Sequence, residues 1–460
     1  MASGGRSSFV ARDSRAGRDT SPARIKPLYK RLPHGPHRLD RSEVILHQRA
    51  RIHGAMIEAV AERGYEGTSV KQVISLAGVS RRSFYEQFAN KQESFLATFD
   101  LLAHQAAQQS RHVYIATDGG LEERLRAAFQ ALAEIVKQEH KPALLVLVEA
   151  QTAGIVGTLR LCKGIATCEQ MLARSFAEAP DANLLPTPIV RGIAGGLHGA
   201  ASNLVRTRRL TDSDALAEEM LRWTMLFQTP KAAQLTKRMT PRPSKRRRDI
   251  SLADTQTHGA TARQPGDERE RLLHNVLRLS ALHEYRELTA PQIADEANVP
   301  IDAFLQDFAD RDECYLAAFD MIAKQMLAVV ADPGLHCATE WPHAVRRTIA
   351  RLMSYLGERP LYARTISQEA FFAGARAVER NLELARTIAT LLTEGAPAAQ
   401  ESTIVLDGIA GAIWHTIRCQ VVNERIQVLS ALSDYLTYIV LVPFIGADAA
   451  IEILTADTPA

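Results

Sequence analysis

The stretch AGVSRRSFYEQFANKQESF, residues 77–95, combines a tight glycine turn with a short basic segment of helical spacing. Ser80 can cap that helix, and Phe84 and Phe88, one helical turn apart, predict its buried side. The remaining faces then carry Arg81, Arg82, Ser83, Tyr85 and Gln87. Arginine suits both the guanine edge and the phosphate backbone, but two arginines and a tyrosine on a small helix also suit a merely solvated face. The glycine turn, the caps, the paired phenylalanines and a basic N-terminal arm together favour a surface for DNA.

The residues before this stretch predict two further helices. Apolar residues recur with helical spacing at Ile52, Met56, Ala59 and Val60. Gly64 is expected to end that helix, and Ser69 with Gln72 forms a capping box for a short second one. Asn90 and Glu93 form another capping pair for a fourth helix. Helix, short helix, turn and short basic helix is the order of a helix-turn-helix, whose last helix enters the major groove.

A second copy of the pattern follows at an offset of 220 residues. Residues 79–100 and 299–320 share 9 identities in 22 positions, including Phe84 with Phe304 and Phe88 with Phe308. Farther on, EAQTAG at Glu149 returns as EAFFAG, and GIAG at Gly192 returns near residue 408. The sequence therefore predicts that a whole unit is duplicated.

The two copies differ at the positions that face outward. Arg81 corresponds to Ile301, Arg82 to Asp302, and Tyr85 to Leu305. An aspartate repels phosphates, and isoleucine and leucine cannot pair with guanine. We expect the second copy to keep the fold without reading DNA, and its exposed apolar residues to suit a protein surface better than water.

The segment RGYEGTSVKQVISLAGVSRRSFYEQFANKQESFLATF resembles the DNA-binding region of TetR-family transcriptional regulators, over about residues 45–100. The resemblance implies a three-helix DNA-binding unit, a connecting fourth helix and a larger helical domain that dimerises and binds a small ligand. It implies base contacts at Arg81, Arg82 and Ser83. It places phosphate contacts at Thr68, Ser69, Tyr85 and Lys91, and Ser80 joins the DNA-binding set as the cap of the reading helix.

The expected fold class is all-α, with two tandem TetR-like units. Two segments without helical period each carry a net charge of +7. Because the whole chain carries +3, the rest of the chain carries −11. The linker block from Lys245 to Arg248 suits either a solvated tether or phosphate contact. The expected parts are a basic arm (1–41), the helix-turn-helix (42–100), a helical ligand and dimerisation domain (101–228), a basic linker (229–266), a degenerate helix-turn-helix (267–320) and a second helical domain (321–456).

Other classes of function find little support in the residues. The longest apolar run, YLTYIVLVPFIGA, is short for a membrane span, and no signal peptide is visible, so we expect a cytoplasmic protein. Cys162 and Cys168 lack zinc-site spacing and partner histidines in the sequence, so no metal is expected. His198 and His415 either line a pocket or are satisfied helix histidines. With no nucleophile constellation or phosphate loop, neither an enzyme nor a cofactor is expected.

The leading hypothesis is a ligand-responsive repressor that binds double-stranded operator DNA with its first helix-turn-helix. Aromatic residues of the second helical domain are candidates to enclose a small apolar ligand. The two units are expected to pair within one chain as a pseudo-dimer, so that a palindromic operator would require two chains. The rival hypothesis is a protein-interaction or enzymatic role in which the helix-turn-helix is a relic.

Overall fold

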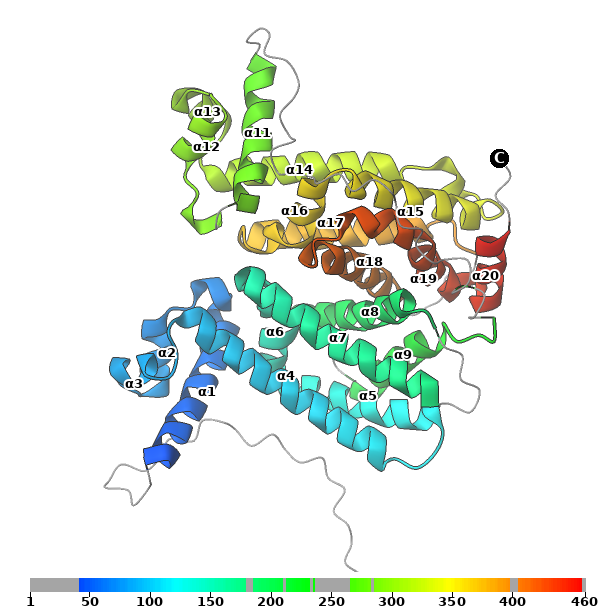
Figure 1. The fold of residues 1–460 in the computed structure, drawn as a ribbon, viewed down its shortest axis with the longest axis horizontal. Coiled ribbons are helices and arrows are strands. Elements are labelled where there is room, and N and C mark those ends of the chain that lie inside the picture. Colours follow the sequence, from blue (N-terminus) through cyan, green and yellow to red (C-terminus); the bar gives the residue numbers. More distant parts are fainter. Residues whose placement is uncertain are drawn as a thin grey trace, which may run out of the picture.

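The computed structural model describes residues 41–178, 185–209, 212–231, 235, 265–282, 285–397 and 404–456. Within these ranges the secondary structure is helical and contains no strand, as the sequence predicts for an all-α protein (Figure 1). The arm before residue 41 and the basic block from Lys245 to Arg248 lie outside the described residues.

The first half begins with four helices that carry the predicted helix-turn-helix. They are α1 (Arg41–Gly67), α2 (Val70–Ala77), α3 (Arg81–Tyr85) and α4 (Lys91–Ala116). Gly64 interrupts α1 with a φ of 69°, a left-handed value that glycine adopts at little cost. The remaining elements are α5 (Leu121–Gln138), α6 (His140–Leu147), η1 (Glu149–Thr152), α7 (Gly154–Glu178), α8 (Thr187–Thr207) and α9 (Ser213–Met225).

The second half opens with a similar order of elements, followed by a second group of packed helices. The opening elements are α11 (Pro265–Leu282), η3 (Tyr285–Glu287), α12 (Ala290–Glu296), α13 (Ile301–Asp307) and α14 (Arg311–Val330). After them come η4 (Pro333–His336), α15 (Trp341–Gly357), α16 (Pro360–Ser367), η5 (Glu369–Phe371), α17 (Ala375–Thr393), α18 (Val405–Val422), η6 (Ile426–Leu432), α19 (Ser433–Ile445) and α20 (Ala447–Thr455).

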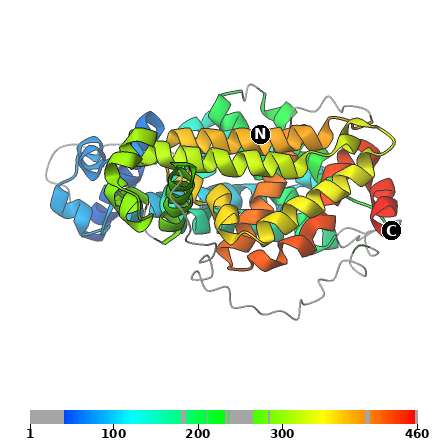
Figure 2. The same ribbon diagram turned by 90° about the horizontal axis from the view of Figure 1, so that it is seen from above.

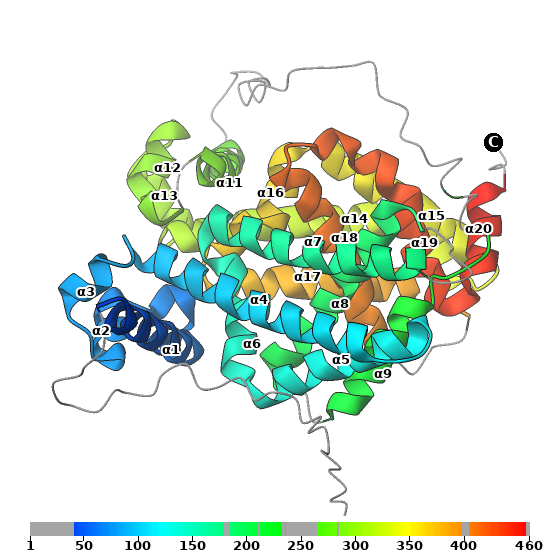
Figure 3. The same ribbon diagram turned by 60° about the horizontal axis from the view of Figure 1, so that its bottom comes forward.

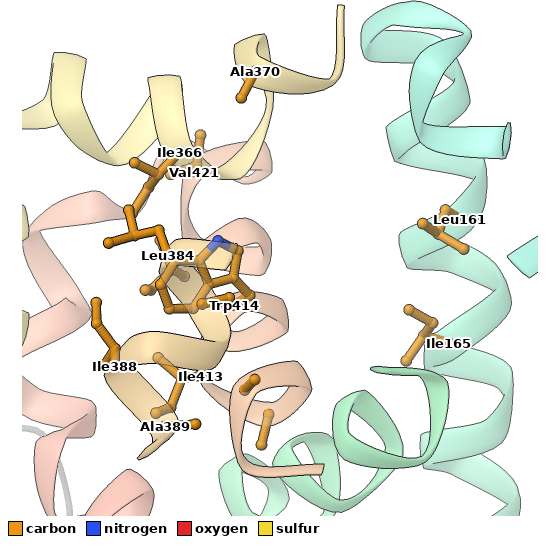
Figure 4. Close-up of a cluster of buried hydrophobic side chains, with 14 of the residues drawn as sticks. Leu161, Ile165, Ile366, Ala370, Leu384, Ile388, Ala389, Ile413, Trp414 and Val421 are labelled. Atoms are coloured by element: carbon orange, nitrogen blue, oxygen red, sulfur yellow. The ribbon is translucent and has the colours of Figure 1, made fainter. Parts of the chain in front are cut away.

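The helix-turn-helix of the first half and the corresponding helices of the second half lie toward the same end of the molecule. Figure 1 shows α1 to α3 and α11 to α13 at the left, with α20 at the opposite end, and the rotated views agree (Figures 2 and 3). Between these ends the longer helices of both halves pack into one body. Its buried interior includes Leu161 and Ile165 of α7, which face the cluster around Trp414 of α18 (Figure 4).

Several side-chain contacts recur at the offset of 220 residues. Lys91 Nζ donates to Tyr65 O over 2.9 Å and lies over the Tyr65 ring. In the second half Arg311 donates to Tyr285 O over 3.1 Å and lies over that ring. Likewise, Arg160 pairs with Asp100, and Arg380 with Asp320.

Helices α8 and α18 form the central contact between the halves. A Cβ placed on Gly199 would lie 2.7 Å from Gly411 Cα, and one on Gly411 would lie 2.6 Å from Gly195 O. The backbones therefore approach as closely as only glycine permits. Polar bonds add to the contact: Asn203 Nδ2 donates to Asp407 Oδ2 over 2.6 Å. Beside these helices, Tyr438 donates its hydroxyl proton to Phe227 O over 2.9 Å.

One apolar stretch is longer than its sequence suggests. Helical structure continues through η6 and α19, from Ile426 to Ile445, which makes 20 residues, and the most apolar window within them has a mean hydropathy of 1.7. By length and composition alone it reaches membrane-spanning size, because η6 precedes the apolar run YLTYIVLVPFIGA. However, 61% of its most apolar window is buried inside the protein, against neighbours such as α15 and α18. The stretch therefore serves as a core helix in this fold.

Candidate nucleic-acid interface

The turn between α2 and α3 is built by local signals that the sequence displays. Ser69 caps α2: its Oγ accepts from Gln72 N, and the Gln72 side chain accepts from Ser69 N over 2.8 Å. Gly78 ends α2 in the left-handed conformation, with φ 58°. Arg51 of α1, which sequence reasoning missed, donates to Gly78 O over 2.6 Å. The turn is thus tied to the first helix as well as capped.

Helix α3 buries one side and exposes the other. Ser80 caps it by accepting from Ser83 N over 3.0 Å. Phe84 and Phe88 are buried beneath it with their ring centroids 5.8 Å apart. These contacts orient α3 so that its outer face is presented to solvent, as the spacing of the two phenylalanines predicts.

Three of the predicted DNA-binding side chains share that outer face. Arg81, Arg82 and Tyr85 are exposed, and the Arg81 guanidinium lies over the Tyr85 ring at 5.7 Å. The Arg82 side chain is 89% exposed and pairs with Glu86 over 2.8 Å. Such a pair is weak in water and readily exchanged for a phosphate or a base. The arrangement offers two cationic donors and an aromatic hydroxyl to a groove.

Two of the residues assigned to phosphate contact face the protein instead. Thr68 is only 3% exposed, and its hydroxyl donates to Gly64 O over 2.8 Å. A contact between its side chain and a phosphate would require this buried group to leave its partner. Lys91 is half-buried because its ammonium group binds Tyr65, as described above. Both side chains therefore hold the backbone near the end of α1, at Gly64 and Tyr65.

The interior of the DNA-binding unit contains a buried histidine and a link to the rest of the half. His53 of α1 lies with Nδ1 2.8 Å from Thr98 Oγ1 of α4, and burial lowers the pKa of His53 to about 4. Glu149 of η1 accepts from Tyr65 N over 2.8 Å, just beyond the break at Gly64. Burial raises the pKa of the Glu149 carboxyl. The break in α1 is thus capped by a side chain from outside the unit.

The corresponding surface of α12 and α13 keeps the capping box of the first of these helices, but Pro300 replaces the serine cap of the second, and the chemistry differs. Thr289 and Gln292 form a capping box, and Asn298 takes the left-handed conformation, with φ 51°. On α13, however, Ile301 is 38% exposed and Leu305 is 55% exposed, with the acidic Asp302 beside them. This face presents no arginine or lysine to a phosphate.

A small cavity lies between the halves, beside α8 and α18. It has a volume of about 90 Å³, and its walls include His198, Asn203, Trp414, His415 and Arg418. Burial lowers the pKa of His198 to about 3, and it lowers that of His415 well below its ordinary value. Both imidazoles are therefore neutral at physiological pH.

The expectation that Cys162 has no histidine partner was wrong. His415 and Cys419 of α18 bring their ligand atoms within 4.8 Å of Cys162 Sγ and of each other. The sequence could not show this, because Cys162 belongs to the first half and the other two to the second. The only local signal is that His415 and Cys419 are four residues apart, which puts them on one helical face. Cys168 is not part of this group.

The features of α1 to α4 define a helix-turn-helix DNA-binding domain. Residues 54–98 match the family described as "Bacterial regulatory proteins, tetR family". The match covers α2, α3 and the adjoining parts of α1 and α4, so the chain contains a DNA-binding domain of the TetR type.

Similar solved structures each cover about two fifths of this chain. The fatty acid degradation regulator FadR of Bacillus halodurans is 20% identical, with a TM-score of 0.36, and is matched over 94% of its length and 39% of this chain. FadR of Bacillus subtilis in complex with stearoyl-CoA is 18% identical, with a TM-score of 0.35 and coverages of 96% and 38%. A TetR-like regulator of Rhodococcus sp. RHA1 is 16% identical, with a TM-score of 0.34 and coverages of 96% and 41%. The comparison with curated proteins gave no match.

Proposed function

We propose that this protein is a ligand-responsive transcriptional repressor that reads operator DNA with α3 and not with α13. The observation that carries the proposal is the contrast between the outer faces of two corresponding helices. Arg81 and Arg82 are exposed on α3, whereas Ile301 and Asp302 are exposed on α13. A groove of DNA attracts the first surface and repels the second.

The roles of the DNA-binding residues follow from their positions. We assign base contacts to Arg81, Arg82 and Ser83, at the start of the reading helix. Ser69, Ser80 and Tyr85 are exposed around it and can donate to phosphates. We assign Thr68 and Lys91 to support of the unit, because their side chains bind its backbone. The basic arm before residue 41 would add affinity that does not depend on sequence.

We further propose that the chain consists of two tandem units with the boundaries predicted above, paired as a pseudo-dimer. The recurrence of contacts at an offset of 220 residues supports the duplication. The close approach of Gly199 and Gly411 supports pairing through α8 and α18. With one reading helix per chain, two chains would occupy a palindromic operator.

The effector site is proposed at the cavity between the halves. Leu382, Ala385 and Trp414 provide apolar walls suited to a small apolar ligand. A ligand there touches both halves, so it can bias how they pair and thereby where α3 lies. We assign the protein no enzymatic step, and we assign the cytoplasm as its place of action, since its proposed binding partner is DNA.

Binding of the full chain to the DNA upstream of its own gene tests the reading helix. Replacing both Arg81 and Arg82 by Ala should weaken specific binding roughly 100-fold or more, since a good bidentate base contact contributes about 1 to 3 kcal/mol. The matched control is Asp302→Ala on α13, which should bind as the wild type does. If Asp302→Ala lost as much affinity as the double variant, the assignment of reading to α3 alone would be wrong.

A further inference from the structure

A buried group of soft metal ligands joins the two halves. Cys162 comes from α7, whereas His415 and Cys419 come from successive turns of α18. The three ligand atoms lie within 4.8 Å of one another, and His415 Nε2 is 3.3 Å from Cys419 Sγ. His415 is buried and both cysteines are partly buried. Neither the DNA-binding surface nor the proposed effector role uses the two thiols.

The spacing of these atoms fits a single metal ion. Metal–sulfur bonds of about 2.3 Å and metal–nitrogen bonds of about 2.0 Å place ligand atoms roughly 3.5 to 4 Å apart. The separation of 3.3 Å and the upper limit of 4.8 Å lie on either side of that value, so small rotations of the side chains suffice. The imidazole of His415 fits beside α8 because residue 195 is a glycine. A Cβ at this position would lie 2.7 Å from His415 Cβ and 3.0 Å from the ring.

The surrounding charges favour a site of net negative charge. Arg191 and Arg418 both act electrostatically on the two thiols. Arg191 is neutralised by Glu169 of α7, with Nε 3.1 Å from Oε2. Arg418 is buried, donates to Ser367 O and lies over the Phe371 ring. No carboxylate within the described ranges forms an ion pair with it.

Charge and ligand number together select the ion. Thiolates prefer soft ions such as Cu⁺ and Zn²⁺. Two thiolates with Zn²⁺ make a neutral site that still lacks a fourth ligand. Two thiolates with Cu⁺ carry a charge of −1, which offsets Arg418, and three ligands complete a trigonal site.

We propose that Cys162, His415 and Cys419 bind one Cu⁺ ion between α7 and α18. On binding, the two thiols each release a proton, and His415 coordinates through a neutral ring nitrogen. The bound ion fixes the first half to the second. This inference does not depend on DNA binding, because its measurements involve no DNA.

The test uses the full chain, reduced and kept free of oxygen, in competition with the Cu⁺ chelator bicinchoninate. The wild type should withdraw one Cu⁺ per chain. Cys162→Ser and Cys419→Ser should each bind at least about 100-fold more weakly. The matched controls Cys168→Ser, on the same helix α7, and Cys337→Ser, at an exposed site, should bind as the wild type does. X-ray absorption of the loaded protein should show two sulfur ligands and one nitrogen ligand.

A loss of Cu⁺ binding in a variant must be distinguished from a loss of folding. His415→Gln keeps a side chain of similar length, and circular dichroism establishes that each variant is helical. Equal Cu⁺ affinity in the wild type and Cys162→Ser would overturn the proposal. So would a preference for Zn²⁺ at the same two cysteines, since the argument from charge and ligand number would then fail. A Cys162 to Cys419 disulfide in the oxidised protein, together with no Cu⁺ uptake by the reduced protein, would overturn it in favour of a thiol redox pair.

Discussion

At the scale of single residues, an ion pair on the proposed reading helix limits the attraction of Arg82 for DNA. Glu86 pairs with Arg82 on the surface that would face DNA. The carboxylate competes with phosphates and bases for the guanidinium, and it also repels the phosphate backbone. The affinity of α3 for DNA is therefore set by this pair as well as by its arginines.

Glu86→Gln should strengthen binding to any DNA fragment by about two- to fivefold, the range expected when one weak surface pair is removed. Fluorescence anisotropy with labelled duplexes at fixed salt measures the change. Glu62→Gln is the matched control, because Glu62 pairs with Arg63 at the end of α1, away from α3. A weaker complex with Glu86→Gln would show that Glu86 positions Arg82 rather than competing for it.

His53 should make stability depend on pH. Its pKa is about 4 in the folded protein and 6.5 when unfolded, so the unfolded chain binds more protons between these values. The contribution is fully present above pH 6.5 and is lost as the pH falls toward 4. Between about pH 7.5 and about pH 5, this residue should cost roughly 2 kcal/mol.

Urea unfolding of the wild type and His53→Gln at both pH values isolates this effect from that of other histidines. The free energy of unfolding of the variant should fall by less over the same interval. An identical fall in both proteins would show that His53 is protonated in the folded state.

At the scale of elements, the contact between α8 and α18 depends on residues without side chains. A Cβ at 411 would lie 2.6 Å from Gly195 O and 2.9 Å from Gly199 Cα, which is closer than van der Waals contact allows. Gly411→Val should therefore lower the free energy of unfolding by about 3 kcal/mol, because overpacking forces the helices apart. Urea unfolding measures it.

Gly164→Ala on α7 serves as the matched control for that experiment. A Cβ there would meet only Phe99 Cζ, at 3.8 Å. Alanine favours the helix, so this variant should be unchanged or more stable by up to about 1 kcal/mol. Equal stability of Gly411→Val and Gly164→Ala would contradict tight packing at the contact.

The elements also show what the sequence can and cannot predict. Ser69, Gly78 and Phe84 act through neighbours a few residues away, so their capping, turn and burial could be predicted. The burial of Thr68 could not, because it depends on how the chain folds around the break at Gly64. The group of Cys162, His415 and Cys419 depends on contact between halves, and the spacing of His415 and Cys419 alone does not reveal Cys162 as their neighbour.

At the scale of the whole molecule, the halves are joined within one chain. Pairing of α8 with α18 is therefore unimolecular and should not weaken on dilution. The midpoint of thermal unfolding should stay constant from about 10 µM to about 0.1 µM protein. A midpoint that fell with dilution would show that stability depends on contacts between chains.

The close contact of Gly199 with Gly411 also changes how this protein can evolve. In a homodimer one gene encodes both sides of the interface, so every substitution appears on both at once. Here the two sides are separate positions of one sequence, and each can change while the other is kept. The same independence lets Asp302 occupy α13 while Arg82 remains on α3. The surface of one half can therefore change while the surface of the other half keeps its residues.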